Sequence, residues 1–244
     1  MRPRLLRLFL TVCLASVSII PARAQIDQVV KKADDAIEHS NAAGLSDDKI
    51  IAGLKEALEV STGKAVALTG RHDGFLGNEA IRIFLPPKLE PIGKGLRMLG
   101  MGEDVDDLEI GMNRAAEKAA PQAKQIFLAA LKRMTFRDAR MILTGNDTAA
   151  TDYFQRTTSS DLADAFTPIV HQSLQQVGVI KQYQHVIKSA PGGSALTGDF
   201  DLDKYVVEKT LDGLFLMCGE EEKKIRKDPA AQTTDLLKEV FGRK

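Results

Sequence analysis

The chain has 244 residues, of which 44% are hydrophobic, and its 33 lysines and arginines balance 33 aspartates and glutamates. This length is enough for one good-sized domain with its own core. With two cysteines and no excess of positive charge, the chain is a poor candidate for a disulfide scaffold or for a protein that binds nucleic acid.

The first 24 residues have the three parts of a secretory signal peptide. A basic start at 1–7 precedes the apolar run Leu8–Ile20, and an A-x-A cleavage site follows at 22–24. We therefore predict cleavage between Ala24 and Gln25 and a periplasmic or secreted location. The leader holds four arginines and no acidic residue, so its removal leaves a net charge of −4. This charge disfavours nucleic acid and anionic membrane surfaces as partners.

Cys218 is the one cysteine that remains after this cleavage, so no internal disulfide can form. It ends the apolar run Leu214–Cys218, which is the longest after the leader and far shorter than the ~20 residues of a membrane-spanning helix. We therefore expect no transmembrane segment in the mature chain. We expect the Cys218 thiol to be buried and inert; an intermolecular disulfide or a reactive thiol is the alternative.

Beyond the leader, apolar residues recur at helical spacing, and glycines, prolines or capping residues separate the segments. An N-terminal helical arm is predicted within 25–44. The further predicted helices span roughly 46–70, 86–100, 104–119, 121–134, 136–144, 148–157, 158–177, 179–188 and 203–227, and a last one follows Asp228-Pro229. A loop with three glycines and one proline is predicted at 189–198.

The segment 71–85 is the least regular part of the chain. Gly74, Gly77 and Asn78 interrupt it, and a short alternation of apolar and polar residues follows at 81–85. This pattern predicts an extended arm or a hairpin strand near 75–85.

The stretch 134–161 contains three signals for the start of a helix. Thr135 has Asp138 three residues later, Asp147 follows a Gly-Asn stop, and Thr158 has Asp161 three residues later. The two helices that they delimit, 136–144 and 148–157, are too short to be stable alone, so we expect neighbouring helices to hold them. The whole pattern predicts an all-α fold: a single helical-bundle-like domain of about eight to ten helices over residues 45–244.

The motifs for metal and cofactor chemistry are incomplete. Asp199, Asp201 and Asp203 have the spacing that opens a calcium loop, but Lys204 and Thr210 stand where that loop needs glycine and glutamate. We predict instead that Asp203 caps the helix that follows. The four histidines have no metal-ligand spacing, so neither a metal nor a cofactor is expected.

Ten polar residues lie within otherwise apolar helices or beside them and form the predicted site. They are Asn113, Arg114, Glu117, Asp138, Asp147, Thr151, Tyr153, Arg156, Glu208 and Asp212. If their helices converge, the carboxylates meet Arg114 or Arg156. Two interpretations stay open: a structural network of ion pairs, or a pocket that binds a polar ligand. Acid–base catalysis with Glu117, Asp138 or Asp212 as the base is a third.

Three blocks of the sequence resemble a bacterial family, the domain of unknown function DUF4197. They are Met112–Lys124, Met134–Phe154 and Glu208–Phe241, and the similarity extends from about Leu45 to Phe241. The resemblance implies a secreted bacterial protein without an assigned activity. The residues favour a non-catalytic helical protein that binds a small ligand or a partner protein. The alternatives are a hydrolase or transferase, and a structural or stress-related interaction module with an apolar surface around Phe75–Leu85.

Overall fold

The structure of the chain is a computed structural model that describes residues 47–176, 178–189 and 200–228. Helices dominate these ranges and no β-strand occurs in them, so the predicted all-α class is confirmed. The predicted leader, the helical arm at 25–44 and the helix after Asp228 lie outside the described residues, as does most of the loop predicted at 189–198.

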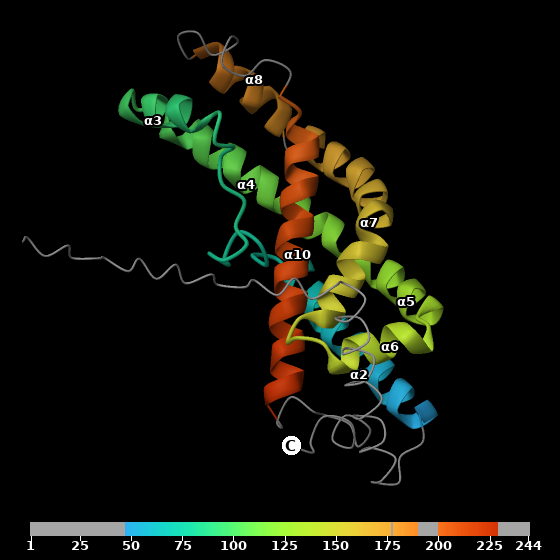
Figure 1. Cartoon of the computed structure of the whole chain (residues 1–244). Coiled ribbons are helices and arrows are strands. Elements are labelled where there is room, and N and C mark those ends of the chain that lie inside the picture. Colours follow the sequence, from blue (N-terminus) through green and yellow to red (C-terminus); the bar gives the residue numbers. More distant parts are fainter. Residues whose placement is uncertain (1–46, 177, 190–199, 229–244) are drawn as a thin grey trace, which may run out of the picture.

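The molecule is elongated, and its last described helix runs along the centre (Figure 1). The elements are α2 (Asp47–Gly70), α3 (Glu90–Met98), α4 (Gly102–Ala119), the 3-10 helix η1 (Ala120–Gln122), α5 (Ala123–Arg133), α6 (Phe136–Thr144), α7 (Ala149–Gln176), α8 (Val179–Ser189) and α10 (Leu202–Lys227). The central α10 contacts α7, α2 and α4, while α3 and α8 lie together at one end. Among these described helices, none has the length and apolarity to cross a membrane.

Aromatic side chains fill the core between α5, α7 and α10. Phe127 lies with its ring centroid 5.0 Å from that of Phe154 and 6.2 Å from that of Phe215, at tilted angles that aromatic pairs favour. Phe75 and Phe166 are also fully buried. Because α7 and α10 both contribute rings, this core joins helices that are distant in the sequence.

Small residues let the α4–α5 region pack closely against its neighbours. Ala115, Ala116 and Ala119 of α4 have no exposed surface, as their spacing predicts for the buried side of a helix. At the end of α2, a Cβ atom on Gly70 would lie 2.8 Å from Cγ of Pro121. Any larger residue at position 70 would therefore push α2 away from η1.

The predicted start of α6 is confirmed. Thr135 and Asp138 form a reciprocal capping box, in which the Thr135 hydroxyl accepts from the Asp138 N–H and the Asp138 carboxylate accepts from the Thr135 N–H. The predicted start at Thr158 is wrong, because α7 continues without a break from Ala149 to Gln176. The Thr158 hydroxyl donates to the carbonyl oxygen of Phe154, at 2.6 Å, and so bonds back within the helix instead of capping a new one.

Two other helix starts also differ from the prediction. The residue that caps α10 is Asp201, whose carboxylate accepts from the N–H of Lys204 at 3.0 Å, and not Asp203. Asp203 lies in the first turn, where its side chain pairs with His171 of α7. The helix expected from Pro86 begins at Glu90, because Pro86 accepts from the N–H of Leu89 in a preceding turn.

Residues 71–89, called the arm below, are irregular and consist largely of turns, and no hairpin strand occurs in them. Turns occupy 71–81, and irregular extended chain follows at 82–86. The arm runs from the end of α2 past α4 and α10 towards α3 (Figure 1). A Cβ atom on Gly213 of α10 would lie 2.6 Å from the Phe75 ring, so this glycine admits the arm to the core.

Candidate functional site

The side chains of one face of α4 bind the backbone of the arm. Asn113 accepts from the N–H of Ile83 at 2.9 Å and donates to the carbonyl oxygen of the same residue at 2.8 Å. Glu109 accepts from the N–H of Leu85 at 3.0 Å. With Glu117, these residues are four apart, so they lie in line along the helix. We call Glu109, Asn113 and Glu117 the α4 polar row.

Glu117 completes the α4 polar row at the start of the arm. Its Oε1 atom accepts from the N–H groups of Phe75 and Leu76, both at 3.1 Å. Its Oε2 atom accepts from Arg114 at 2.6 Å. All three members of the row are buried, with Asn113 fully enclosed. Buried polar groups need partners, and here the backbone of the arm supplies them.

Arg114 extends this arrangement to the surface. Its guanidinium donates to Glu117 and to Asp73, which begins the arm, at 2.6 and 2.7 Å. Partial burial opposes the charge of Arg114, but the hydrogen bonds to the two carboxylates raise its pKa overall. The hydrogen bond from Arg114 lowers the pKa of Asp73. Both groups are therefore charged at neutral pH.

The last turns of α10 hold the start of α7 and the end of α6. Glu222 accepts from the N–H groups of Ala150 and Thr151, at 2.9 and 2.8 Å, and from the Thr151 hydroxyl. Arg226 donates to Glu222 and to the carbonyl oxygen of Ile142. A carboxylate at a helix start and a guanidinium near a helix end both complement the helix dipole. We call Glu222 and Arg226 the α10 ion pair.

Several predicted site residues take part in these contacts or lie beside them. Asn113, Arg114 and Glu117 hold the arm, and Thr151 binds the α10 ion pair. Asp147 pairs with Lys227 of α10. Tyr153 is buried, and its hydroxyl donates to the carbonyl oxygen of Ala130 at 3.3 Å. Burial raises the pKa of Tyr153.

The other four predicted residues have their contacts on their own helix or its cap. Asp138 belongs to the capping box of α6, and Arg156 lies 5.9 Å from the Tyr153 ring centroid. Glu208 and Asp212 are exposed on α10 beside Lys204 and Lys209. The ten residues therefore do not meet in one cluster, because α10 turns Glu208 and Asp212 to the solvent. Their role in binding a ligand stays a prediction.

The predicted site did not include Glu109, Glu222 or Arg226. Glu109 stands four residues before Asn113, on the same face of α4. This spacing could have indicated that Glu109 lies beside Asn113. Glu222 and Arg226 belong to the charged run 220–226, which is typical of a solvated helix face. Only the position of α7 and α6 against α10 shows that these two side chains point inward.

A pocket of about 240 Å³ opens between the arm, α3 and α4. Its lining consists of Phe84, Leu85, Glu90, Gly93, Lys94, Arg97, Val105 and Glu109. Two charges at its edge have partners, since Lys94 lies 3.8 Å from Glu90 and Arg97 lies 2.6 Å from Asp106. The pocket thus combines a small apolar wall with charges of both signs.

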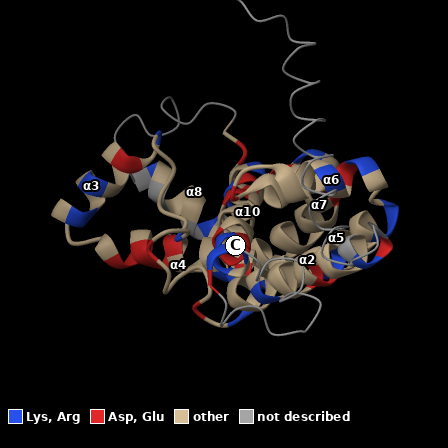
Figure 2. Ribbon diagram, turned by 60° about the horizontal axis from the view of Figure 1, so that its bottom comes forward, with Lys and Arg blue, Asp and Glu red and all other residues tan. Residues whose placement is uncertain are grey.

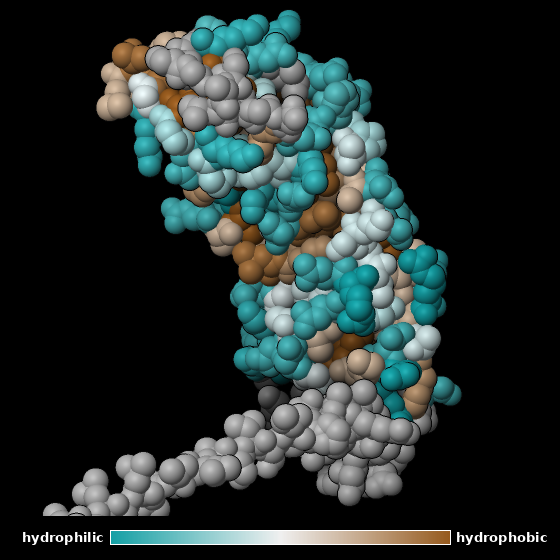
Figure 3. All heavy atoms as spheres, turned by 45° about the horizontal axis from the view of Figure 1, so that its top comes forward, coloured by the Kyte–Doolittle hydropathy of each residue, from teal (hydrophilic) through white to brown (hydrophobic). Residues whose placement is uncertain are grey.

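The apolar surface expected around Phe75–Leu85 is not present. Phe75, Ile83 and Leu85 are buried, and Phe84 is the large apolar side chain of this segment that is exposed. Other exposed apolar residues are Met98 and Leu99 at the end of α3, Phe136 and Met141 on α6, and Ile110 and Leu216. Figure 3 shows apolar surface at the end of the molecule that carries α3.

Cys218 is buried on α10. Burial and the neighbouring Glu222 and Glu221 raise the pKa of Cys218 well above its usual value, which agrees with the expected inert thiol. No group of three or more His, Cys, Asp or Glu side chains within 47–176, 178–189 and 200–228 is placed to hold a metal ion. His171 lies 2.5 Å from Asp203 and 2.7 Å from Gln175, and this trio connects α7 to α10.

Comparison with known protein families finds a match over most of the chain. A family model described as "Protein of unknown function (DUF4197)" matches residues 44–242. No curated protein and no solved structure matches the chain.

Proposed function

Since the chain belongs to the DUF4197 family, whose description names no activity, we propose a role from its own residues. The protein is a periplasmic, non-catalytic binding protein that meets its partner at its surface, and its buried polar residues have structural roles. The leader pattern at 1–24 supports the periplasmic location. That pattern lies outside the described residues.

One observation carries the proposal. The buried carboxylates Glu109, Glu117 and Glu222 all accept hydrogen bonds from backbone N–H groups of this same chain. A general base needs a free oxygen within reach of a substrate proton. Both oxygens of Glu117 and of Glu222 already have donors. The arrangement therefore favours structural roles for these groups over catalysis.

The other carboxylates considered for catalysis support the same conclusion. Asp138 accepts from the N–H and the hydroxyl of Thr135, and Asp212 pairs with Lys209 at 3.0 Å on the exposed side of α10. Neither residue lies in the pocket. Two carboxylates that act together in hydrolysis need a shared cleft. Asp138 and Asp212 lie on different helices, α6 and α10.

Native mass spectrometry of the protein recovered from the periplasm tests this proposal. We expect the mass of the protein to correspond to a chain without residues 1–24. We also expect no bound small molecule whose binding requires the α4 polar row. The variants Asn113→Ala and Glu117→Gln, with Gln122→Ala as an exposed control on η1, identify such a dependence. A stoichiometric bound molecule that is lost from the first two variants and kept in the control would contradict the proposal.

The pocket beside α3 supports a second candidate, a small polar ligand held between the arm and α4. Its rim carries the negative Glu90 and the positive Lys94 and Arg97 around apolar atoms of Phe84 and Val105. This rim fits a ligand with one positive and one negative group. Lys94 is exposed, so Lys94→Ala should leave the fold intact. A bound mass that disappears in this variant, but stays in Gln122→Ala, would favour the second candidate.

A further inference from the structure

The outer face of α6 combines apolar and basic side chains. Successive residues of an α-helix are 100° apart, so Phe136, Arg137, Arg140 and Met141 fall within one sector. Phe136 is 41% exposed and Met141 is 48% exposed. The opposite sector carries Ala139 and Ile142, which are buried. Therefore α6 attaches through one side and presents Phe136, Arg137 and Met141 on the other, with Arg140 half-buried beside them.

The end of α5 adds two cations next to this face. Lys132 and Arg133 are exposed, and Figure 2 shows lysines and arginines gathered where α5 and α6 meet. Between residues 132 and 141 the chain has four basic residues and one acidic residue, Asp138. The Asp138 carboxylate accepts from Thr135 within the capping box. Arg133 also lies 3.7 Å from Asp161, with both side chains mostly exposed.

Arg140 lies over the ring of Phe136, with its guanidinium carbon 4.6 Å from the ring centroid. This cation–π contact keeps a positive charge directly beside an exposed aromatic side chain. Long basic side chains can lay their methylene groups along apolar surface while the charged ends reach polar groups. The face of α6 is thus amphipathic in a way that suits a boundary between water and lipid.

We propose that the outer face of α6 and the adjoining end of α5 dock onto the surface of an anionic phospholipid membrane. Phe136 and Met141 enter the headgroup region, and Lys132, Arg133 and Arg137 contact lipid phosphates. We infer an anionic membrane because the basic side chains of this face complement negative lipid phosphates. The short helix α6 lies at the periphery of the molecule (Figure 1). A pocket is found elsewhere, between the arm, α3 and α4. The proposal is independent of the function proposed above.

The overall charge of the chain argues against such binding, but the local charge decides it. A membrane surface attracts charges within about one Debye length, roughly 8 Å at physiological ionic strength. The acidic residues that offset the chain's basic residues are spread over other helices, such as the run Glu103–Asp107 at the start of α4. That run lies at the end of α4 next to α3, away from α6, while Asp161 of α7 lies close enough to Arg133 to offset part of its charge.

Vesicle co-sedimentation tests the proposal. Vesicles of phosphatidylcholine with about one-third phosphatidylglycerol should bind the purified protein, and pure phosphatidylcholine vesicles should not. Binding should weaken in 0.5 M salt, because counterions screen the charges. Every variant is compared in the same form of the chain, so any contribution from the apolar run Leu8–Ile20 is common to all of them.

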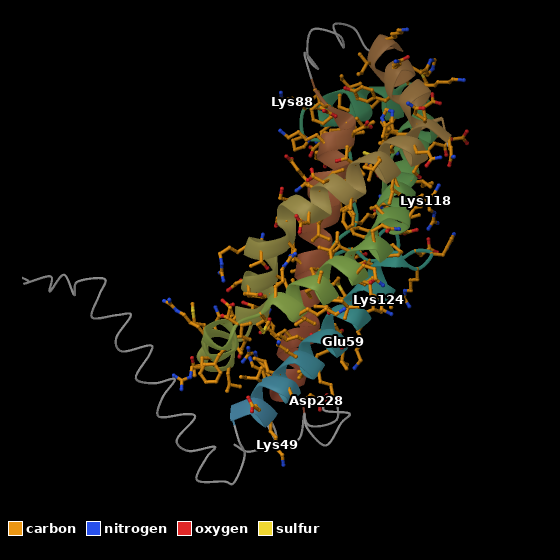
Figure 4. The ribbon with its side chains drawn as sticks, turned by 90° about the vertical axis from the view of Figure 1, so that its right-hand side faces the viewer. Lys49, Glu59, Lys88, Lys118, Lys124 and Asp228 are labelled. Atoms are coloured by element: carbon orange, nitrogen blue, oxygen red, sulfur yellow. The ribbon has the colours of Figure 1, made fainter. Side chains whose placement is uncertain are left out.

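Paired variants assign the binding to this face. Lys132→Glu with Arg137→Glu should lower vesicle binding by about tenfold or more, since each basic residue near an anionic surface contributes roughly fivefold. The control, Lys88→Glu with Lys181→Glu, makes the same change in net charge at the other end, where Figure 4 places Lys88. It should keep most of the binding.

A second pair tests the apolar contribution. Met141→Ser should lower binding several-fold, while Met98→Ser, at an 84% exposed position at the end of α3, should not. Circular dichroism checks the fold of each variant. If the double reversal does not fold, Lys132→Gln with Arg137→Gln measures the same dependence with half the change in charge.

Four results would overturn the proposal. They are no binding to anionic vesicles, equal binding to both kinds of vesicle, an equal loss in the Lys88 and Lys181 control, and no loss in the Lys132 and Arg137 variants. Soluble polyglutamate provides a further comparison. Binding to polyglutamate that depends on Lys132 and Arg137, without binding to vesicles, would assign the face to an acidic protein instead.

Discussion

Asn113 shows how a single side chain can replace a neighbouring strand. Its amide accepts from the N–H and donates to the carbonyl oxygen of Ile83, which is the pair of bonds that two antiparallel residues exchange. Asn113 also donates to the carbonyl oxygen of Glu109. The backbone of an extended segment must be paired when it is buried. An asparagine on a helix supplies that pairing here without a β-sheet.

Asn113→Ala should therefore cost about 2–4 kcal/mol of unfolding free energy, because it leaves two buried backbone groups of Ile83 without partners. Gln122→Ala, at an exposed position on η1, should change the stability by less than about 0.5 kcal/mol. Urea unfolding measures both values. Hydrogen exchange should also show faster exchange at Ile83 in the first variant; unchanged protection there would contradict the role given to Asn113.

At the scale of helices, the ends of α6 and α7 depend on side chains from α10. Helix starts leave backbone N–H groups without partners within the helix. Glu222 provides acceptors for two of these groups in α7, while Arg226 binds a carbonyl oxygen near the end of α6. Side-chain exposure is 5% for Glu222 and 12% for Arg226. A buried pair of this kind fixes one arrangement of three helices.

Glu222→Ala should destabilise the protein by about 3–5 kcal/mol, since it leaves Arg226 buried without its carboxylate. Glu220→Ala is the matched control, because the Glu220 side chain is 46% exposed and pairs with Lys223 of the same helix at 2.9 Å. That control should lose less than about 1 kcal/mol. Urea unfolding compares the two variants, and equal losses would show that Glu222 does not have the role described.

Glycines on two helices allow another paired comparison. A Cβ atom at Gly213 would lie 2.6 Å from the Phe75 ring and 3.1 Å from Cβ of Ile81, whereas a Cβ atom at Gly63 of α2 meets nothing within 4 Å. Gly213→Ala should cost about 1–3 kcal/mol because the arm must move. Gly63→Ala should gain roughly 0.5–1 kcal/mol from helix propensity. In thermal unfolding, Gly213→Ala should lower the melting temperature and Gly63→Ala should raise it.

For the whole molecule, the arm acts as a connection between α2 and α3 that is fixed along its length. The α4 polar row binds it at three points, and the hydroxyl of Tyr205 on α10 donates to the carbonyl oxygen of Phe84 at 3.0 Å. Its first contact, between Asp73 and Arg114, lies at the surface. The Asp73 side chain is 53% exposed, so this contact is open to solvent ions and to changes in pH.

The pKa of Asp73 is lower in the folded protein than its usual value, mainly because Arg114 donates to it. A lowered pKa contributes stability above the unfolded-state value, and this stability is lost as the pH falls through the folded-state value. The melting temperature of Asp73→Asn should therefore depend less on pH below about 4 than that of the wild type. Asparagine tolerates the positive φ of 60° at this position. Equal pH dependence in both proteins would contradict this contribution.

The sequence predicted local features where a local interaction decides the structure. The Thr135–Asp138 capping box, the buried side of α4 and the burial of Cys218 all depend on spacing within one helix. At Thr158 this logic gave the wrong result, because a threonine hydroxyl either caps a new helix or bonds back to the preceding turn. At Thr158 the second arrangement occurs, because the buried side of α7 continues from Phe154 before it to Leu162 after it.

Local spacing and composition, then, determined the all-α class, most helix bounds and the irregular character of the arm. The tertiary structure alone decided which polar groups meet. It turned Glu222 and Arg226 inward and Glu208 and Asp212 outward on the same helix, and it set the α4 polar row against the arm. The physical reason is that a charged side chain specifies only its need for a partner or for water. The packing of distant helices determines which of the two it receives.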